Sequence, residues 1–266
     1  MFAHKKIKLY LCHMLTCYNV SMLTCKHVNT KKISEVMKRQ NRIIVFANQK
    51  GGVGKTTLCT LFADFLVKEG EPVAVIDADI QQTIFEQRRD ELAEAGTEET
   101  PWDVVPLDTT VLSEVEEAMA MAKDFPGTIL IDTPGNVSED NLLPIYLHAD
   151  YIICPMSYHP NVVKSTKKFA LIMDQIKKSL GVSFKLWFVP NMIDERRTLN
   201  AEENKLYAWK ELHMHGTTLF QINNRAWLER TSTLSMTSQQ WISVRLAFGL
   251  IKAQIESIEE ENHDKA

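Results

Sequence analysis

The sequence predicts an α/β fold, namely a doubly wound and mostly parallel β-sheet with helices on both faces. Three observations lead to this prediction. Short runs rich in Val, Ile, Leu and Phe alternate along the chain with longer segments of helical periodicity. These runs are apolar throughout, which is typical of strands that are buried on both faces. A glycine-rich loop joins the first such run to the first helical segment. The alternation therefore indicates βαβ units in a single parallel sheet.

From residue 42 onward the expected strands and helices follow one another in a regular order. The strands are the short apolar runs, at 43–47, 73–77, 104–107, 128–132, 151–155, 184–190 and 218–222. The helices show apolar residues three or four positions apart, at 56–68, 82–95, 111–123, 141–148, 162–179, 201–213 and 238–260. We expect one domain over 41–255, a basic extension over 1–40 and an acidic, frayed tail over 256–266.

Composition narrows the class of protein. The chain has 266 residues, of which 45% are hydrophobic and 24% are charged, an ordinary balance for a soluble domain with its own core. A net charge of −4 argues against a protein that is basic as a whole. The five cysteines form no regular disulfide framework, and no apolar run is long enough to span a membrane. These features favour a reduced, cytoplasmic setting without a secretory signal.

The first forty residues differ from the rest of the chain. Residues 1–42 hold nine Lys or Arg and one acid, a net +8, so the remainder carries −12. The segment has no clear strand or helix period, and we interpret it as a disordered extension or an over-long start, with Met37 as a possible true start. A zinc site is disfavoured because zinc ligands usually come in tight Cys pairs. The candidate ligands here are more widely spaced: Cys12, His13, Cys17, Cys25 and His27.

The loop between the first strand and the first helix predicts a phosphate-binding site. It reads FANQKGGVGKTT over residues 46–57, a variant in which the usual first glycine falls near Asn48. Glycines let the backbone turn tightly and direct N–H groups at an anion, and the following helix adds its positive dipole end. Lys55 can reach the β- and γ-phosphates, and the Thr56 hydroxyl can ligate Mg²⁺. The residues expected to bind the nucleotide are Gly51, Gly52, Val53, Gly54, Lys55, Thr56 and Thr57.

Acidic residues follow two of the buried strands, where ligands bind in doubly wound folds. Asp132 ends the run TILID, and we expect it on the magnesium side of the site, through water. Asp77 and Asp79 end another run, VIDAD. One of this pair can serve Mg²⁺ while the other orients the attacking water. A solvated strand end would give the same pattern.

Taken together, KGGVGKTT, DADIQQ and ILIDTPG resemble the deviant Walker A ATPases of the ParA/MinD type, a group of P-loop NTPases. The resemblance covers about residues 41–255. It implies that Lys50 reaches across an ATP-sandwich homodimer to the partner's phosphates, while Lys55 serves its own subunit. A lysine ahead of the glycine turn converges poorly with Lys55 on one phosphate, which supports this division. The resemblance also implies that ATP and Mg²⁺ are the cofactors.

The same resemblance assigns the remaining site residues. Asp79 matches the aspartate linked to hydrolysis, Asp77 the acid before it and Asp132 the Walker B acid. Asn191 matches the asparagine that meets the adenine ring. Two departures concern the base pocket more than the phosphates: Ile80 stands where proline is common, and the segment FQINNRAW lacks a late proline.

The run NMID over 191–194 has the N-x-x-D shape of guanine recognition. The lysine expected inside that motif is replaced by Met192, which favours ATP over GTP.

The resemblance also suggests the biological role. Residues 160–230 hold twelve Lys or Arg against seven acids, a surplus that suits phosphate contacts with non-specific double-stranded DNA. The basic groups include Lys164, Lys167, Lys168, Arg196, Arg197, Arg225 and Arg230. We expect a partition ATPase, located in the cytoplasm on the nucleoid, whose slow hydrolysis is stimulated by a ParB-like activator with a basic N-terminal peptide. A solvated helix face would explain the same basic residues.

Other roles were weighed against this one. A conjugative-transfer ATPase would share the biochemistry, and QQTIFEQRR over 81–89 resembles such mobile-element proteins. MinD-like membrane positioning is disfavoured because the C-terminus, IESIEEENHDKA, is acidic. Cluster carriage is disfavoured because the chain has no CxxC. A non-hydrolysing scaffold is disfavoured because Lys50 and Asp79 are both present.

Overall fold

The structure is a computed structural model that describes residues 41–135, 140–194 and 200–264. Three sequence-based predictions lie outside these residues: the zinc ligands, the alternative start at Met37, and Arg196 with Arg197.

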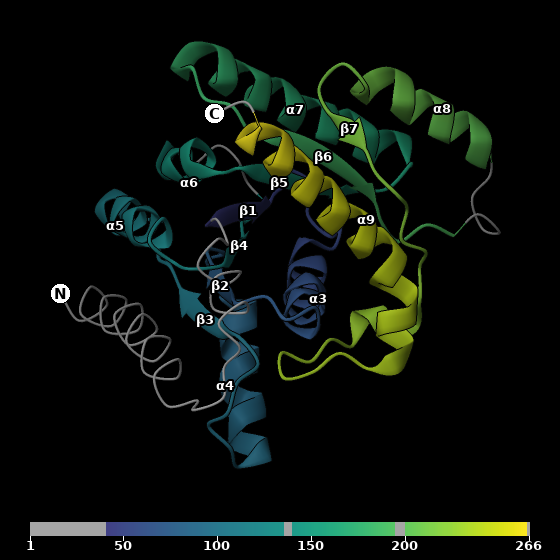
Figure 1. The fold of residues 1–266 in the computed structure, drawn as a ribbon. Coiled ribbons are helices and arrows are strands. Elements are labelled where there is room, and N and C mark those ends of the chain that lie inside the picture. Colours follow the sequence, from purple (N-terminus) through teal and green to yellow (C-terminus); the bar gives the residue numbers. More distant parts are fainter. Residues whose placement is uncertain (1–40, 136–139, 195–199, 265–266) are drawn as a thin grey trace.

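The sheet has seven strands, and every pairing between neighbours is parallel. The strand order is β3-β2-β4-β1-β5-β6-β7, so the first strand lies at the centre (Figure 1). The strands are β1 (Arg42–Phe46), β2 (Val73–Asp77), β3 (Asp103–Pro106), β4 (Thr128–Asp132), β5 (Tyr151–Met156), β6 (Lys185–Pro190) and β7 (Thr217–Thr218). The predicted doubly wound parallel fold is confirmed.

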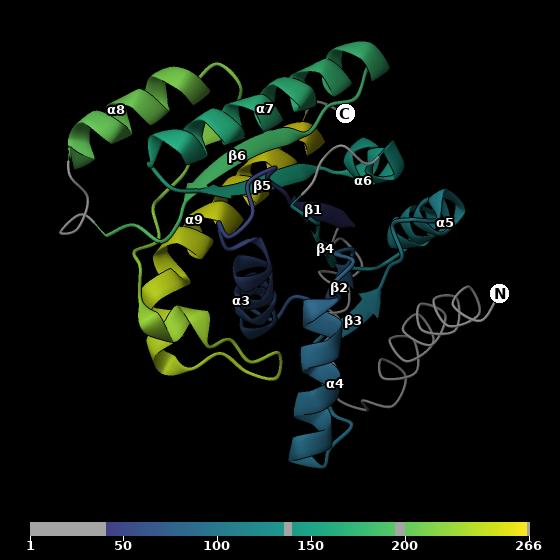
Figure 2. The same ribbon diagram turned by 180° about the vertical axis from the view of Figure 1, so that it is seen from behind.

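Helices cover both faces of the sheet. They are α3 (Lys55–Lys68), α4 (Thr83–Ala95), α5 (Leu112–Ala122), α6 (Leu143–His148), α7 (Pro160–Leu180), α8 (Ala201–Leu212) and α9 (Ser238–His263), with 3₁₀ turns η1 (Asp140–Leu142) and η2 (Ala226–Glu229). Helix α9 lies in front of the sheet in Figure 1 and behind it in Figure 2, where α7 is in front. No helix in the described ranges is long and apolar enough to cross a membrane.

Strand β1 shows how the two layers of core are built. Ile43 and Val45 pack with α5, α6 and α7, whereas Ile44 and Phe46 pack with α3 and α9. Because successive strand residues point to opposite faces, a wholly apolar run is what a strand needs between two helical layers. The α3–α9 layer is rich in aromatic contacts, such as Phe62 with Phe248 at 5.0 Å between ring centroids.

The sequence prediction is wrong at the edge strand. Residues 218–222 were expected to form a strand, but β7 has only two residues. The following segment stays near β6, since Leu219 N donates to Phe188 O and Ile222 N to Pro190 O, yet it leaves the regular ladder. At the open edge of a sheet no second neighbour holds the chain in register, so the apolar run alone does not fix a strand there.

The prediction is also wrong at the C-terminus, because α9 continues to His263 instead of fraying after Glu256. Arg42 at the start of β1 donates to both carboxylate oxygens of Glu259, at 2.6 and 2.9 Å, and Lys252 pairs with Glu256. These contacts partly neutralise the acidic residues near the end of α9. At the other end, Thr237 and Gln240 form a capping box that starts the helix.

A buried polar cluster ties α3 and α4 to the segment before α9. The Trp102 indole N–H donates to Asp64 Oδ1 at 2.7 Å, and the Arg88 guanidinium lies over the Trp102 ring. Arg88 also donates to the backbone oxygens of Trp102 and Thr233, both at 2.6 Å. Burial raises the pKa of Asp64 to about 6, although the Trp102 hydrogen bond and the Lys68 charge oppose this shift.

This cluster makes stability depend on pH. Because the folded-state pKa of Asp64 lies above its ordinary value near 3.9, the ionised group destabilises the fold, and stability is lost as pH rises from about 4 through about 6. Asp64→Asn keeps an acceptor for Trp102 and does not titrate. When the pH is raised from 4 to 7, we expect the unfolding free energy of the wild type to fall by about 2 kcal/mol relative to that of Asp64→Asn. Urea unfolding at both pH values measures this difference.

Asp124→Asn, at an exposed position, serves as the control. Identical dependence of the unfolding free energy on pH in wild type and Asp64→Asn would contradict the prediction.

Candidate nucleotide-binding site

The glycine loop leaves β1 and enters α3 with a backbone that only glycine adopts easily. Gly52 has φ of 72° and Gly54, just before the helix, has φ of 90°. A Cβ at Gly54 would lie 2.4 Å from Asn191 Nδ2, so a side chain is excluded there by space as well as by conformation. Gly51 differs, because a Cβ on it would meet nothing within 4 Å. Gly51 and Gly52 are exposed, which leaves their backbone accessible to a ligand.

Two buried asparagines hold this loop against the neighbouring strands. Asn191, after β6, donates from Nδ2 to Val53 O at 2.9 Å. Asn48 donates from Nδ2 to Pro155 O at 2.8 Å and to Thr166 Oγ1 at 3.0 Å, while its Oδ1 accepts from Lys50 N. The loop is therefore preformed, with its turn fixed by side chains that follow β1 and β6 and by Thr166 of α7.

The two lysines of the loop occupy different environments. Lys55 is buried, with 8% of its surface exposed, and a Cβ on Gly135 after β4 would lie 3.6 Å from its Nζ. The Lys55 ammonium thus lies inside the chain's own site. Lys50 is exposed, and within the described residues no acid forms an ion pair with it. Its charge is available to a group outside this chain.

The predicted carboxylates Asp77 and Asp132 lie side by side, because they are register partners on adjacent strands. Both are fully buried. Thr56 Oγ1 donates to Asp132 Oδ2 at 2.6 Å, and Asp77 Oδ2 accepts from Ile84 N and Phe85 N at the start of α4. Burial, and then the Asp77 charge, raises the pKa of Asp132 to about 8, and burial raises the pKa of Asp77 to about 6.

These oxygens fit a magnesium ion shared with a phosphate. Asp77 Oδ1 and Asp132 Oδ1 are both buried, and neither has a hydrogen-bond partner in the described part of the chain. Two anionic oxygens next to a threonine hydroxyl are hard ligands of the kind Mg²⁺ prefers. The described residues contain no cluster of three or more His, Cys, Asp or Glu that could cage a metal alone. This suits Mg²⁺, which usually keeps waters and phosphate oxygens among its ligands.

The loop after β2 connects this site to α4. Asp79 is partly exposed there, and its Oδ1 accepts from Gln81 N at 2.9 Å. Gln82 then caps α4 with φ of 47°, an unusual value for a residue with a side chain. Met192, beside Asn191, has φ of 57°. Such strained residues concentrate at functional sites, and these two follow β2 and β6, two strands of the sheet that carries the site.

A small hollow of about 10 Å³ adjoins the first turn of α3. Its lining comprises Thr57, Leu58, Asn191, Met192, Asn223, Asn224, Arg225, Leu228 and Glu229. It lies next to the loop, and Asn191 belongs both to its lining and to the support of the loop.

Comparison with known proteins identifies the family. Residues 44–224 match the family described as the CobQ/CobB/MinD/ParA nucleotide binding domain, which is more than half of the chain. The chain belongs to this family. Among curated proteins, it is 27% identical to the protein IncC of Escherichia coli in an alignment of 202 residues that covers 65% of this chain. The chain spans only 56% of the length of that relative.

Solved structures of CobQ/CobB/MinD/ParA type agree in fold. A protein of Borrelia burgdorferi assigned to plasmid partition, bound to AMPPNP, is 18% identical with a TM-score of 0.62, over 82% of this chain and 100% of that one. An ATP complex of McdA from Cyanothece is 16% identical with a TM-score of 0.62, over 82% and 97%. The cell division ATPase MinD of Pyrococcus furiosus is 18% identical with a TM-score of 0.59, over 82% and 100%.

The structure brings together most of the residues that the motifs single out in this MinD/ParA-type chain. The loop residues, Lys55, Asp77 and Asp132 converge at the carboxyl ends of β1, β2 and β4, whereas Lys50 and Asp79 lie at the more exposed rim. The sequence gives no signal for Thr166, which supports Asn48 from 118 positions away. For Asn48 itself the only signal is that it stands where the usual first glycine would be.

The two glycines make a matched test of the preformed loop. Gly54→Ala forces a side chain into left-handed backbone and against Asn191, so we expect it to destabilise the protein by about 1–3 kcal/mol or more and to weaken nucleotide binding. Gly51→Ala is expected to cost less than about 1 kcal/mol, because its Cβ meets open space. Denaturant unfolding without nucleotide measures both. Equal losses in the two variants would show that the loop is not held by Asn191.

Proposed function

We propose that this protein is an ATP-dependent dimerising switch of the ParA type, which binds DNA non-specifically and hydrolyses ATP slowly to segregate or position DNA. The observation that carries this proposal is the contrast between the two loop lysines. Lys55 is buried in its own site, whereas Lys50 is exposed at the head of the same loop. A single-subunit nucleotide site has no use for the second cation, but a site completed by a partner subunit does.

The nucleotide is ATP in this proposal. The loop over 51–57 wraps the phosphates, and Asn191, which follows β6, meets the adenine. Magnesium would be held by Thr56 and by Asp132 and Asp77, and when bound it neutralises charge on the phosphates. Two structural relatives, from Borrelia and Cyanothece, are described as bound to AMPPNP and to ATP. Met192, in place of the lysine of a guanine motif, supports ATP over GTP.

Hydrolysis requires an oriented water, and Asp79 is the residue proposed for that role. It lies at the rim of the site on the loop before α4, and that loop is anchored where Asp77 accepts from Ile84 N and Phe85 N. Among the described residues, the Asp79 carboxylate accepts only from Gln81 N of its own turn, so it can turn toward a water. We propose slow turnover because the rim is exposed and completed only by the partner and an activator of the ParB-like type.

Dimerisation follows from the placement of Lys50. An exposed ammonium beside a phosphate loop can neutralise charge on the nucleotide of a facing subunit, as an arginine finger does in trans. ATP would then hold two subunits together, and hydrolysis would release them.

The DNA surface is proposed on α7. Lys164, Lys168 and Lys178 are exposed and, together with Leu171 and Gln175, follow one face at spacings of three and four. Two other lysines of this helix are engaged, since Lys167 pairs with Glu211 at 2.8 Å and Lys177 lies over the Phe184 ring. Exposed lysines without acids contact phosphates without reading sequence. With such a surface the protein is proposed to act in the cytoplasm, on the nucleoid.

The first test is binding of random-sequence duplex DNA with no nucleotide, with ADP, and with ATP and Mg²⁺. We expect binding only with ATP, because only the ATP-bound dimer joins two DNA surfaces. Lys50→Ala is expected to weaken this binding by at least about tenfold while each subunit still binds ATP. Lys123→Ala removes another exposed lysine and is the control. ATP hydrolysis without DNA binding in any state would leave an ATPase switch whose cargo is a protein or a membrane.

The second test addresses the surface itself. We expect Lys164→Ala/Lys168→Ala to weaken DNA binding to all sequences alike and to lower the slope of log affinity against log salt by about 2, since each phosphate contact contributes about one. ATP hydrolysis without DNA should not change, because these residues do not contact the nucleotide site. Filter binding across a salt series measures the slope. An unchanged slope would show that α7 carries only a solvated face.

A further inference from the structure

We propose that a groove beside α9 docks an acidic amphipathic helix of a partner protein. This site goes beyond the proposed function, since it requires neither nucleotide nor DNA. The α9 groove has a volume of about 490 Å³. Its lining comprises Phe220, Gln221, Asn223, Arg225, Trp227, Gln239, Ile242, Ser243, Leu246 and Ala247.

The groove lies between the segment that leaves β7 and the first half of α9. In Figure 1 this segment descends from β7 beside α9 to the turn below it. The open edge of the sheet ends here, because β7 pairs only with β6. The groove is therefore bounded by two elements of one face, and a helix can lie along it without displacing any part of the described chain.

The walls of the groove are apolar and exposed. Ile242 is 66% exposed, Leu246 56% and Phe220 48%. Ile242, Leu246 and Leu250 are four positions apart, so they form a stripe along one side of α9. Contiguous exposed apolar surface of this kind marks an interaction site, and a stripe facing a hollow fits the apolar face of another helix.

The groove is preformed. The Trp227 indole N–H donates to Ser243 Oγ at 3.0 Å across it. Behind it, Gln240 Nε2 donates to Trp227 O at 2.9 Å and to Arg230 O at 3.0 Å, which fixes η2 against α9. A partner helix would therefore bind without first ordering the walls, which reduces the entropic cost of association.

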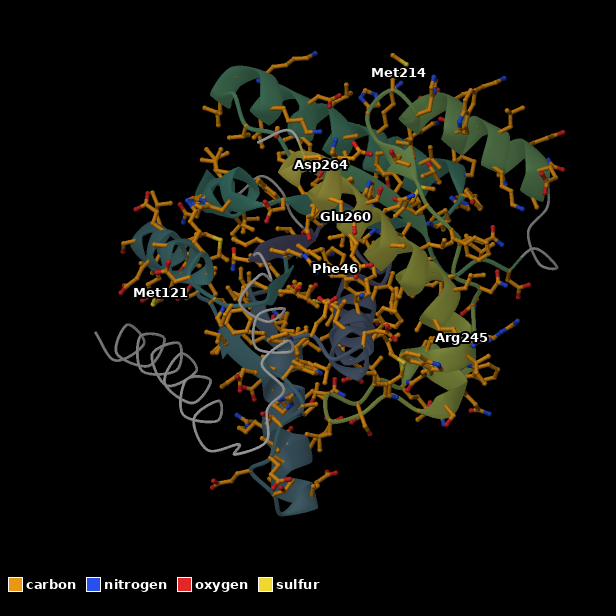
Figure 3. The ribbon with its side chains drawn as sticks, viewed as in Figure 1. Phe46, Met121, Met214, Arg245, Glu260 and Asp264 are labelled. Carbon is orange, nitrogen blue, oxygen red and sulfur yellow. The ribbon has the colours of Figure 1, made fainter. Side chains whose placement is uncertain are left out.

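The charge of the side chains in and beside the groove favours an acidic partner. No lining residue is acidic, while Arg225 lines the groove and Arg245 is exposed on α9, where Figure 3 labels it. Among the described residues no carboxylate forms an ion pair with either arginine. A helix with an apolar stripe flanked by Glu or Asp would cover the apolar walls and supply those carboxylates.

Two other occupants fit less well. A second copy packed antiparallel on the stripe, centred on Leu246, would bring the two Arg245 side chains within about one turn of each other, and like charges repel. A lipid surface would meet a hollow instead of a projecting helix face, and α9 ends in acidic residues such as Glu256 and Glu260. The basic peptide expected of a ParB-like activator would also be repelled, so this groove takes a different partner.

The test uses two fluorescent helical peptides and the full-length protein without nucleotide. One peptide carries leucines at helical spacing flanked by glutamates, and the other replaces each glutamate by lysine. We expect the acidic peptide to bind at least about tenfold more tightly, as measured by fluorescence anisotropy. Leu246→Asp should abolish this preference, and Arg245→Glu should reverse it. Leu206→Asp, at an exposed leucine on α8, is the matched control and should bind as wild type does.

Several results would overturn the proposal. They are failure of the acidic peptide to bind at about 1 mM, equal binding of both peptides, or equal binding by wild type and Leu246→Asp. Binding to anionic phospholipid vesicles that is lost in Leu246→Asp would assign the groove to a membrane. A nucleotide-independent dimer that is lost in Leu246→Asp would assign it to a second copy. Circular dichroism of each variant confirms that the fold is retained, and ATP binding by Leu246→Asp separates this proposal from the nucleotide site.

Discussion

The site depends on the hydrogen bonds that hold the glycine loop against the carboxyl ends of β5 and β6. Gly54 leaves room for the Asn191 amide, which in turn holds Val53 O, and Asn48 ties the other end of the loop to Pro155 O. These contacts use buried polar groups, which are costly to leave unpaired, so the loop has one favourable position. Every other part of the site is placed relative to that loop.

The sheet order gives this loop its acidic neighbours. Since β4 pairs with β1 and β2 pairs with β4, the carboxylates of Asp132 and Asp77 reach the same buried place. Each uses one oxygen within the protein, on Thr56 and on the start of α4, and leaves the other without a partner in the described residues. The raised pKa of Asp132 reflects this arrangement, because burial and a neighbouring acid both disfavour its charge. Two such oxygens are of the kind that Mg²⁺ prefers as ligands.

The Lys and Arg side chains of the protein also differ in burial. Lys55 and Arg88 are buried, and Arg88 is hydrogen-bonded to Trp102 O, whereas Lys50, Lys164 and Arg245 are exposed. The three exposed groups lie on different elements, namely the glycine loop, α7 and α9. We propose a different occupant for each: the phosphates of a facing subunit, a nucleic acid backbone and an acidic helix. The apolar stripe beside Arg245 is what distinguishes the last surface from a plain basic patch.

The sequence by itself determined the parallel sheet, its strand and helix sequence and the phosphate loop. It could do so because wholly apolar runs, helical periodicity and glycines before a lysine are local patterns with direct physical causes. Asp77 and Asp132 were also predictable, since the carboxyl ends of parallel strands meet at one edge. The tertiary structure alone decided the support of Asn48 by Thr166, the hold of Asn191 on the loop and the length of α9. It also decided that residues 219–222 leave the ladder and form one wall of a groove. These features depend on contacts between distant segments, such as Arg42 with Glu259, 217 positions apart, which no local pattern records.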